Sequence, residues 1–242
     1  MIKVKKIHKS FSDKHILNNI SFDISNGDSI AIIGQSGTGK SVLLKHLNGL
    51  LRPDSGTVSV DNVIINEVSY VELQNIRKKM AMVFQFGALF DSMNIEDNIL
   101  LAIKSLTNLS NKNIPSRIDK SLELVELNNV KHLMPSEISG GMKKRVGIAR
   151  AIAINPEYIL YDEPTTGLDP ITTDKINQLM KKVSEKKKVT SIIVTHDMKT
   201  LKYVSNKVIM LHEGNIIFND ETELLFKSND KFIKHFVKGE SI

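Results

Sequence analysis

The beginning of the chain alternates apolar and polar positions with a period of two, which is typical of a half-buried β-strand. Residues 1–11 alternate in this way and lack the continuous apolar stretch of a signal peptide. Apolar runs follow at 20–24 and 29–33, separated by the turn residues Asn26-Gly27-Asp28, and a further alternating stretch covers 57–60. The pattern predicts strands joined by turns in this first part of the chain.

Further along, helical periodicity alternates with short apolar runs. Residues 41–48 and 171–187 are predicted helices, whereas 80–84, 158–161 and 191–195 are predicted strands. A helix between two apolar strands is typical of a parallel sheet. The sequence therefore predicts an α/β fold.

Helical patterns predominate between these strands, at about 88–155. In the segment 115–128, Pro115 suits a first helical turn, and Ile118, Leu122 and Val125 recur at helical spacing. We interpret this region as a helical insertion into the α/β fold.

The end of the chain, 222–242, is basic and is predicted to form two short helices. Phe232, Ile233, Phe236 and Val237 form one apolar face. This face packs either on its own domain or on a neighbouring subunit. Because the face is short, we favour its own domain.

Composition excludes several functional classes. The 242 residues are 41% hydrophobic and 25% charged, which is ordinary for a globular protein. The chain contains no Cys, which excludes disulfides, thiolate metal sites and a Cys nucleophile. No apolar run approaches the ~20 residues needed to cross a bilayer, so we expect a soluble, intracellular protein.

The net charge of +6 first suggests a nucleic-acid partner. However, the basic residues form short runs such as 77–79, 143–145 and 186–188 in predicted helices, without interleaved aromatic residues to stack on bases. Solvated helix faces explain these runs better, and the charge also suits an anionic membrane face. We therefore expect no nucleic-acid partner.

A phosphate-binding motif follows the apolar run at 29–33. It fits the pattern G-x-x-x-x-G-K-[ST] and precedes the predicted helix 41–48. In such a P-loop, backbone N–H groups and the helix N-terminus surround phosphate oxygens, Lys40 reaches the β- and γ-phosphates, and the Ser41 hydroxyl binds Mg²⁺. The residues expected to bind the nucleotide are Gly34, Gln35, Ser36, Gly37, Thr38, Gly39, Lys40 and Ser41.

Two adjacent carboxylates follow the predicted strand 158–161. Successive strand residues point to opposite sides, so Asp162 can face Mg²⁺ while Glu163 faces the γ-phosphate and the attacking water. The carboxyl ends of parallel strands are also where ligands of α/β proteins bind. Beside a P-loop, the two acids predict hydrolysis of a nucleoside triphosphate.

A second candidate anion site, Ser139-Gly140-Gly141, stands directly before a predicted helix at 142–154. By itself this pattern is an ordinary helix cap with a flexible entry. Because a P-loop enzyme already has one phosphate-binding loop, a second one suggests contact with a nucleotide held by another subunit.

The order of motifs along the chain resembles that of the ATP-binding subunit of ATP-binding cassette (ABC) transporters. The motifs are GQSGTGKS, Gln85 after a strand, ISGGM, YILYDEP with TGLDP, and a strand-terminal His196. The resemblance covers about 1–220. It implies a P-loop NTPase with a RecA-like α/β core, an N-terminal antiparallel β-subdomain and a helical subdomain. It also implies a head-to-tail homodimer. In that dimer, Ser139, Gly140 and Gly141 contact ATP on the partner's P-loop, and Asp169 lies in the loop between the sites.

The resemblance assigns roles to three further residues. Gln85 binds Mg²⁺ or water and couples ATP to the membrane partner, while His196 donates to a γ-phosphate oxygen. Phe11 matches the aromatic residue that stacks on adenine, with packing in the core as the alternative. The expected catalytic residues are Glu163, His196, Lys40 and Gln85, and the expected metal ligands are Ser41, Gln85 and Asp162.

Two local features narrow the family. The usual signature Leu-Ser-Gly-Gly-Gln has Met142 in place of the final Gln here, which removes an amide from that position. The segments FQFGALFDSM at 84–93 and LMPSE at 133–137 resemble Mla-type ATPases. ATPases of this type power lipid traffic between bacterial membranes with a permease and a lipid-carrying MCE-domain protein.

We therefore expect one cassette over 1–242: core and β-subdomain at about 1–87 and 156–221, helical subdomain at about 88–155, and a helical tail at 222–242. The expected activity is ATP hydrolysis with Mg²⁺, energising transport of phospholipid or a related lipid. The expected partners are a second copy, an integral-membrane permease, an MCE-domain protein and an accessory subunit. The expected location is peripheral, on the cytoplasmic face of the inner membrane.

Two alternatives stay open. An ABC ATPase for another cargo, such as amino acids or lipoproteins, would have the same motifs. A soluble ABC ATPase acting on ribosomes or DNA usually has two cassettes in one chain or a long coiled coil, and this sequence has neither.

Overall fold

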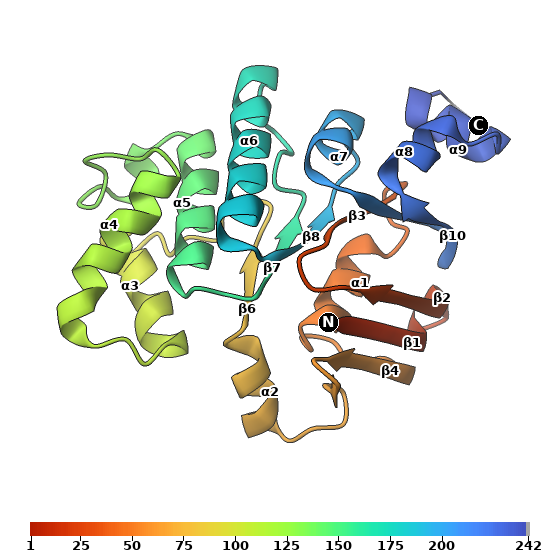
Figure 1. Ribbon diagram of the computed structural model, residues 1–242, viewed down its shortest axis with the longest axis horizontal. Coiled ribbons are helices and arrows are strands. Elements are labelled where there is room, and N and C mark those ends of the chain that lie inside the picture. Colours follow the sequence, from red (N-terminus) through yellow and green to blue (C-terminus); the bar gives the residue numbers. More distant parts are fainter. Residues whose placement is uncertain (241–242) are drawn as a thin grey trace.

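The computed structural model describes residues 1–240, whose strands form two sheets (Figure 1). The strands are β1 (Ile2–Phe11), β2 (Lys14–Ile24), β3 (Ser29–Gly34), β4 (Ser55–Val60), β5 (Val63–Ile64), β6 (Met80–Val83), β7 (Tyr158–Asp162), β8 (Thr190–Val194), β9 (Lys207–His212) and β10 (Asn215–Glu221). The helices are α1 (Lys40–Leu47), α2 (Tyr70–Arg77), α3 (Ile95–Leu106), α4 (Ile114–Leu124), α5 (Gly140–Ala153), α6 (Pro170–Lys187), α7 (Met198–Val204), α8 (Thr222–Lys227) and α9 (Lys231–Lys238), with 3₁₀ turns at Asn111–Asn113 and Pro135–Glu137.

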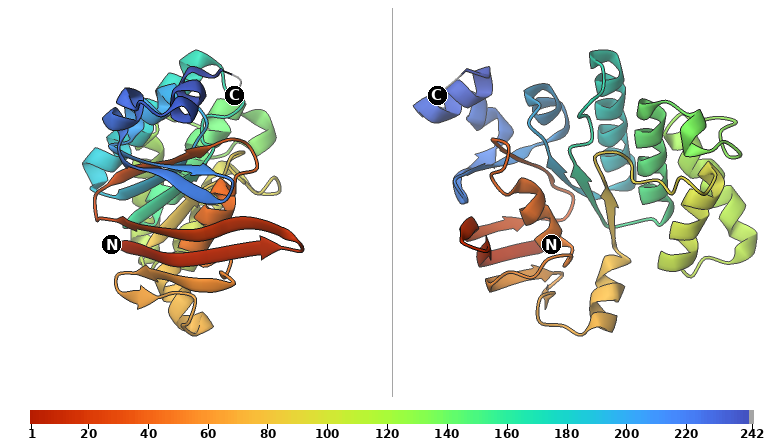
Figure 2. Two further views of the ribbon diagram at one scale, coloured as in Figure 1. Left: turned by 90° about the vertical axis from the view of Figure 1, so that its right-hand side faces the viewer. Right: turned by 180° about the vertical axis from the view of Figure 1, so that it is seen from behind.

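The first sheet is antiparallel, in the order β2-β1-β4-β5. Ile2 and Val4 alternate onto the buried side of β1, and the register shift between Val4 and Ile7 returns Ile7 to that side. All three are buried in the same cluster as Leu43 and Leu47 of α1. The sheet and α1 therefore cover one face of the second sheet, as the two views of Figure 2 show.

The second sheet has the order β10-β9-β3-β8-β7-β6, and β9, β3, β8, β7 and β6 are parallel. Its continuous apolar runs are buried, as expected for strands covered on both faces. Parallel neighbours end at the same edge, so the segments following β3, β8, β7 and β6 lie side by side. This edge brings together the P-loop, His196, the acid pair and Gln85.

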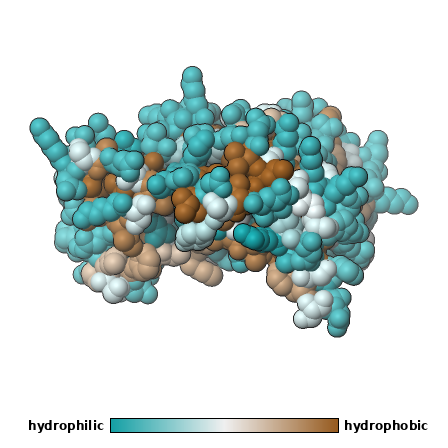
Figure 3. Space-filling model, turned by 90° about the horizontal axis from the view of Figure 1, so that it is seen from below, coloured by the Kyte–Doolittle hydropathy of each residue, from teal (hydrophilic) through white to brown (hydrophobic). Residues whose placement is uncertain are grey.

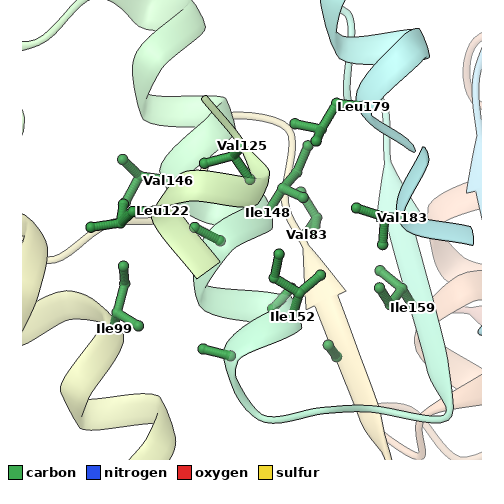
Figure 4. Packing of buried hydrophobic residues seen from close by; sticks show 14 of the residues in the cluster. Val83, Ile99, Leu122, Val125, Val146, Ile148, Ile152, Ile159, Leu179 and Val183 are labelled. Carbon is green, nitrogen blue, oxygen red and sulfur yellow. The ribbon is translucent and has the colours of Figure 1, made fainter. Parts of the chain in front are cut away.

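Helices α3, α4 and α5 form the helical region, and their apolar faces join those of α6 and β7 in one cluster (Figure 4). Ile118, Leu122 and Val125 are buried in it as predicted. The predicted end of this helix at 128 is wrong, because α4 stops at Leu124. Glu126 has φ 58°, and backbone bonds from Glu126 N to Glu123 O and from Leu127 N to Leu122 O close the helix in a Schellman motif.

The tail helices α8 and α9 lie on the same domain. Ile233 of α9 is buried in a cluster with Val208 and Met210 of β9, and Phe236 packs against this cluster. Within residues 1–240, every helix is too short or too polar to cross a membrane.

Candidate functional site

A pocket of about 790 Å³ lies at the sheet edge where β3, β6, β7 and β8 end. The predicted site residues that line it are Gly34, Gln35, Ser36, Gly37, Gly39, Lys40, Ser41, Gln85, Glu163 and His196. Six further residues line the pocket and were not predicted as site residues: Ile16, Val42, Thr166, Phe236, Gly239 and Glu240. The P-loop pocket, as we call it, thus contains residues from six separate parts of the chain.

The P-loop needs glycine at two of its positions. A Cβ on Gly34 would collide with the carbonyl oxygen of Leu211 on the neighbouring strand β9. Gly39, the N-cap of α1, has φ 93°, in the left-handed region that glycine favours. These two residues allow the chain to turn sharply from β3 into α1, which leaves the first N–H groups of the helix available for an anion.

Lys40 closes this loop from the inside. Its Nζ donates to the carbonyl oxygens of Gly34 and Gln35, at 2.9 Å each, and the residue is only 7% exposed. Burial lowers the pKa of Lys40, although the nearby carboxylates of Glu163 and Asp162 act in the opposite direction. A bound phosphate would compensate the positive charge of this buried ammonium group.

Ser41 and Asp162 meet at the base of the pocket. The Ser41 hydroxyl donates to Asp162 Oδ1 at 2.8 Å, which joins the start of α1 to the end of β7. Asp162 is the last residue of β7 and is outside the pocket lining. The pair fits Mg²⁺ as P-loop proteins bind it, with few protein oxygens and the remaining ligands from phosphate and water.

The residues described contain no cluster of three or more His, Cys, Asp or Glu side chains suited to a metal. A P-loop magnesium site does not need such a cluster, because it borrows ligands from the nucleotide. The donor set of Ser41 and Asp162, with the Gln85 amide in the same pocket, is therefore compatible with the predicted metal.

Glu163 lies inside the pocket and is 15% exposed as a side chain. Its Oε2 accepts a hydrogen bond from Thr166 Oγ1 at 2.9 Å and lies 2.8 Å from His196 Nδ1. Its backbone has φ 49°, unusual for a residue with a side chain, and its N–H donates to Val194 O at 3.0 Å. The chain thus leaves β7 in a strained turn that holds the carboxylate at the sheet edge.

The loop after β6 connects the pocket to α5. Gln85 lines the pocket, and two residues later the carbonyl oxygens of Gly87 and Ala88 each accept a hydrogen bond from Arg150 of α5, at 2.7 Å. Gly147 of the same helix packs so closely that a Cβ there would lie 3.2 Å from Gly87 Cα. These contacts fix the loop against α5.

The predicted signature residues lie in a separate pocket of about 370 Å³, which also includes Asp169. Ser139 is the N-cap of α5, and Gly140 and Gly141 are the first residues of the helix rather than a loop before it. Asp169 caps α6 by accepting from Thr172 N at 3.0 Å, and this bonding to Thr172 lowers the pKa of Asp169. Within the described chain, the two pockets share no residue.

Besides Asp162, two predicted site residues are outside both pocket linings. Thr38 is in the P-loop, where its hydroxyl donates to Gln35 O at 2.8 Å, but it is outside the pocket lining. Phe11 is 46% exposed, beneath the Lys9 ammonium at 5.3 Å from the ring centre, and is likewise outside the lining. Of the residues that were missed, Thr166 had a detectable signal, because it follows Glu163 by three positions in a turn-forming segment.

Comparison with known proteins explains this combination of pockets. Residues 17–166, well over half of the chain, match the ABC transporter family. The chain belongs to the ABC transporter ATPases. The predicted family, fold class and ATPase activity are thereby confirmed, and the structure of the cassette MJ0796 with ADP and Pi has the same fold (TM-score 0.83, 33% identity, 92% of this chain and 99% of that one).

Several relatives of this ABC ATPase match it over its whole length. The intermembrane phospholipid transport ATP-binding protein MlaF of Haemophilus influenzae is 38% identical, with 91% of its own length covered. The ribonucleotide transport ATP-binding protein mkl of Mycobacterium leprae is also 38% identical (70% covered), and the methionine import protein MetN of Clostridium tetani is 37% identical (76% covered). The similarity to MlaF supports the Mla type, while the three names describe three different cargoes.

Proposed function

We propose that Glu163 is the general base of ATP hydrolysis in this ABC ATPase. Its carboxylate lies in the P-loop pocket and has two hydrogen-bonding neighbours, Thr166 and His196, that fix its direction. A carboxylate so placed can accept a proton from a water molecule that attacks the γ-phosphate. This single arrangement carries the proposal.

The remaining groups of the pocket position the substrate. The P-loop N–H groups and Lys40 bind the phosphates, and Ser41, Asp162 and Gln85 would hold Mg²⁺. When bound, Mg²⁺ neutralises charge on the phosphate oxygens. The His196 side chain is 61% exposed. Its ring can therefore turn toward a γ-phosphate oxygen, while Glu163 keeps its hydrogen bond to Thr166.

The active unit is a head-to-tail homodimer in this proposal. The signature pocket, with Ser139 at the N-cap of α5, offers a helix N-terminus to an anion, yet it is separate from the P-loop pocket of the same chain. A second copy can bring its signature residues to the γ-phosphate held by the first. The solved structure of MJ0796, with ADP and Pi, is a dimer.

A membrane permease is the second partner we propose. Large apolar side chains are exposed next to Gln85, namely Phe84, Phe86 and Phe90, with Phe86 77% exposed. Apolar surface between polar residues is also visible on the face of the molecule toward α2 (Figure 3). Exposed apolar patches of this kind mark interaction sites. A permease segment docked here would contact the loop that contains Gln85.

Phospholipid or a related lipid is the cargo we propose, carried between bacterial membranes with an MCE-domain protein and an accessory subunit. The similarity to MlaF supports this cargo, and the local segments at 84–93 and 133–137 agree with it. The names of MetN and mkl make amino acids and nucleotides the competing cargoes. A permease partner would place the ATPase on the cytoplasmic face of the inner membrane.

The test is purification of the tagged chain from detergent-treated membranes of the native organism, followed by mass spectrometry of co-purifying proteins and lipids. We expect a multispanning permease, an MCE-domain protein and bound phospholipid. The substitution Phe86→Asp should lose the permease and keep ATP hydrolysis, whereas Tyr203→Asp, an exposed aromatic residue of α7, should keep both. Recovery of an amino-acid-binding protein, or of ribosomes or DNA, would exclude the lipid proposal.

A further inference from the structure

A group of buried polar side chains lies between helices α6 and α7, which are side by side in the fold (Figure 1). Asn177 of α6 is 2% exposed, and Thr200 of α7 is fully buried. Their neighbours along the two helices, Ile176 and Leu201, are apolar and equally buried. Apolar side chains can pack two helices together without help, so the presence of two polar ones at this contact requires another reason.

The Thr200 hydroxyl is at the centre of this group. It lies 2.6 Å from Asp197 Oδ2, 3.0 Å from Asn177 Oδ1 and 3.4 Å from Thr165 Oγ1. Asp197 is the N-cap of α7 and also accepts from the Lys199 N–H at 2.9 Å. One hydroxyl group thus contacts α6, the start of α7 and the segment that follows β7. We call these four residues, Thr165, Asn177, Asp197 and Thr200, the Thr200 network.

The Thr200 network is joined to both partners of the Glu163–His196 contact. Asp197 directly follows His196 in the chain. Thr165 directly precedes Thr166, whose hydroxyl donates to Glu163 Oε2 at 2.9 Å. The same carboxylate oxygen lies 2.8 Å from His196 Nδ1 in the P-loop pocket. A displacement of the central hydroxyl would therefore disturb the chain on both sides of this contact.

Hydrogen bonding within the network is incomplete. A hydroxyl group has one proton, so Thr200 can donate to Asp197 or to Asn177 but not to both at once. In addition, Asn177 Nδ2 is buried and has no hydrogen-bond partner within residues 1–240. An unpaired buried polar group destabilises a folded protein. Stability therefore does not account for the Asn177 amide, and its position between α6 and Thr200 favours a role in placing the site residues.

We propose that Asn177 and Thr200 are positioning residues for ATP hydrolysis. They tie α6 to the two chain segments that carry Glu163 and His196. Neither residue lines the P-loop pocket, so their effect on the reaction passes through the groups that do. The inference rests on the roles proposed above for Glu163 and His196.

The experiment measures kcat and KM for ATP, together with the melting temperature, in variants of the full chain. Thr200→Val keeps the shape of the side chain without the hydroxyl. It should lower kcat about tenfold and leave KM within about twofold of the wild-type value, because the site residues are misplaced while the P-loop is unchanged. Asn177→Leu should lower kcat in the same way, with a melting temperature equal to or above that of the wild type. Thr200→Ser, which keeps the hydroxyl, should retain most of the wild-type kcat.

A double variant and a matched control sharpen this test. Asn177→Leu combined with Thr200→Val should be no slower than Thr200→Val alone, because both changes break the same contact. Thr222→Val is the control, since Thr222 is also buried and its hydroxyl lies 3.1 Å from Ser205 Oγ, outside the P-loop pocket. This control should leave kcat unchanged.

Wild-type kcat in both Thr200→Val and Asn177→Leu would overturn the inference. A loss of kcat that follows the melting temperature across the variants, or that Thr200→Ser does not restore, would also overturn it, because the residues would then be purely structural. Glu163→Gln separates this inference from the proposed function. If Glu163→Gln hydrolyses ATP normally, the site assignment itself is wrong, whereas a slow Glu163→Gln beside normal Asn177 and Thr200 variants rejects only the positioning role.

Discussion

His196 Nδ1 lies 2.8 Å from Glu163 Oε2, the same oxygen that accepts the hydroxyl of Thr166. The two residues follow adjacent parallel strands, β8 and β7, so the pairing of those strands brings them together. The carboxylate is therefore oriented by the fold before any substrate binds.

Glu163→Gln should lower the rate of ATP hydrolysis by at least ~100-fold, because an amide cannot accept the proton of the attacking water. The amide keeps the shape of the side chain, so ATP should still bind and should hold the dimer together. Phosphate release and light scattering after gel filtration measure the two effects. Glu157→Gln, the same change on an exposed residue before β7, is the control. Unchanged turnover in Glu163→Gln would remove the residue from this role.

Mixing two inactive variants should restore activity if each site combines two chains. Lys40→Ala disables the P-loop, and Ser139→Arg blocks the signature pocket. In a mixed dimer, the intact P-loop of one chain meets the intact signature of the other. We expect negligible ATP hydrolysis from each variant alone and measurable hydrolysis from the mixture. A mixture as inactive as its components would argue against the head-to-tail arrangement.

Ser41→Ala should increase the Mg²⁺ requirement of the ATPase. The substitution removes the hydroxyl that now donates to Asp162 and is proposed to face the metal. The Mg²⁺ concentration for half-maximal hydrolysis should rise about tenfold, while Ser41→Thr should resemble the wild type. A magnesium titration at fixed ATP concentration measures this. Equal requirements in all three proteins would show that Ser41 does not contact the metal.

Arg150→Ala should reduce turnover without reducing ATP binding. Arg150 bonds to the carbonyl oxygens of Gly87 and Ala88 and so fixes the loop of Gln85 on α5. Loss of both bonds should lower kcat about tenfold through misplacement of Gln85, and Arg150→Lys should recover part of it. Steady-state kinetics measure the loss of turnover, and calorimetry measures whether ATP binding is retained. A lower melting temperature with normal kcat would indicate a purely structural role.

Asp61 should make stability depend on pH in the acid range. Burial would raise its pKa, but hydrogen bonds from the N-terminal ammonium, Tyr158 and Lys79 lower it to about 2. A carboxyl whose pKa is lower in the folded state stabilises the protein above its unfolded pKa of 3.8, and the contribution is lost as pH falls toward 2. Since Asp61 is 29% exposed, we expect Asp61→Asn to cost about 1 kcal/mol at pH 7.

Thermal melting of wild type and Asp61→Asn measures this effect. The difference in melting temperature should be constant above pH 5 and should narrow between pH 4 and pH 3. Asp119→Asn, which removes an exposed partner of Lys131, serves as the control and should have a smaller effect. A difference that does not change with pH would show that the Asp61 charge is not involved.

The sequence by itself determined the chemistry of this protein. Each candidate group is defined by residue types at short spacing: the P-loop, the acid pair after an apolar strand, and the strand-terminal His196. Such local patterns can be recognised without knowledge of the fold. Helical and strand periodicity likewise predicted the α/β class. The end of α4 was not predicted correctly. The residue with left-handed backbone conformation after this helix is Glu126, and not the glycine that usually indicates a helix end.

Only the tertiary structure decided which of these residues meet. The order β3-β8-β7-β6 joins strands that are far apart in the chain, and hydrogen bonding between distant segments sets that order rather than any local pattern. The same long-range packing separated Ser139 from the P-loop and placed Phe236 beside it. A local pattern can specify a phosphate-binding loop. Which residues lie opposite that loop depends on how side chains from distant parts of the sequence pack and become buried.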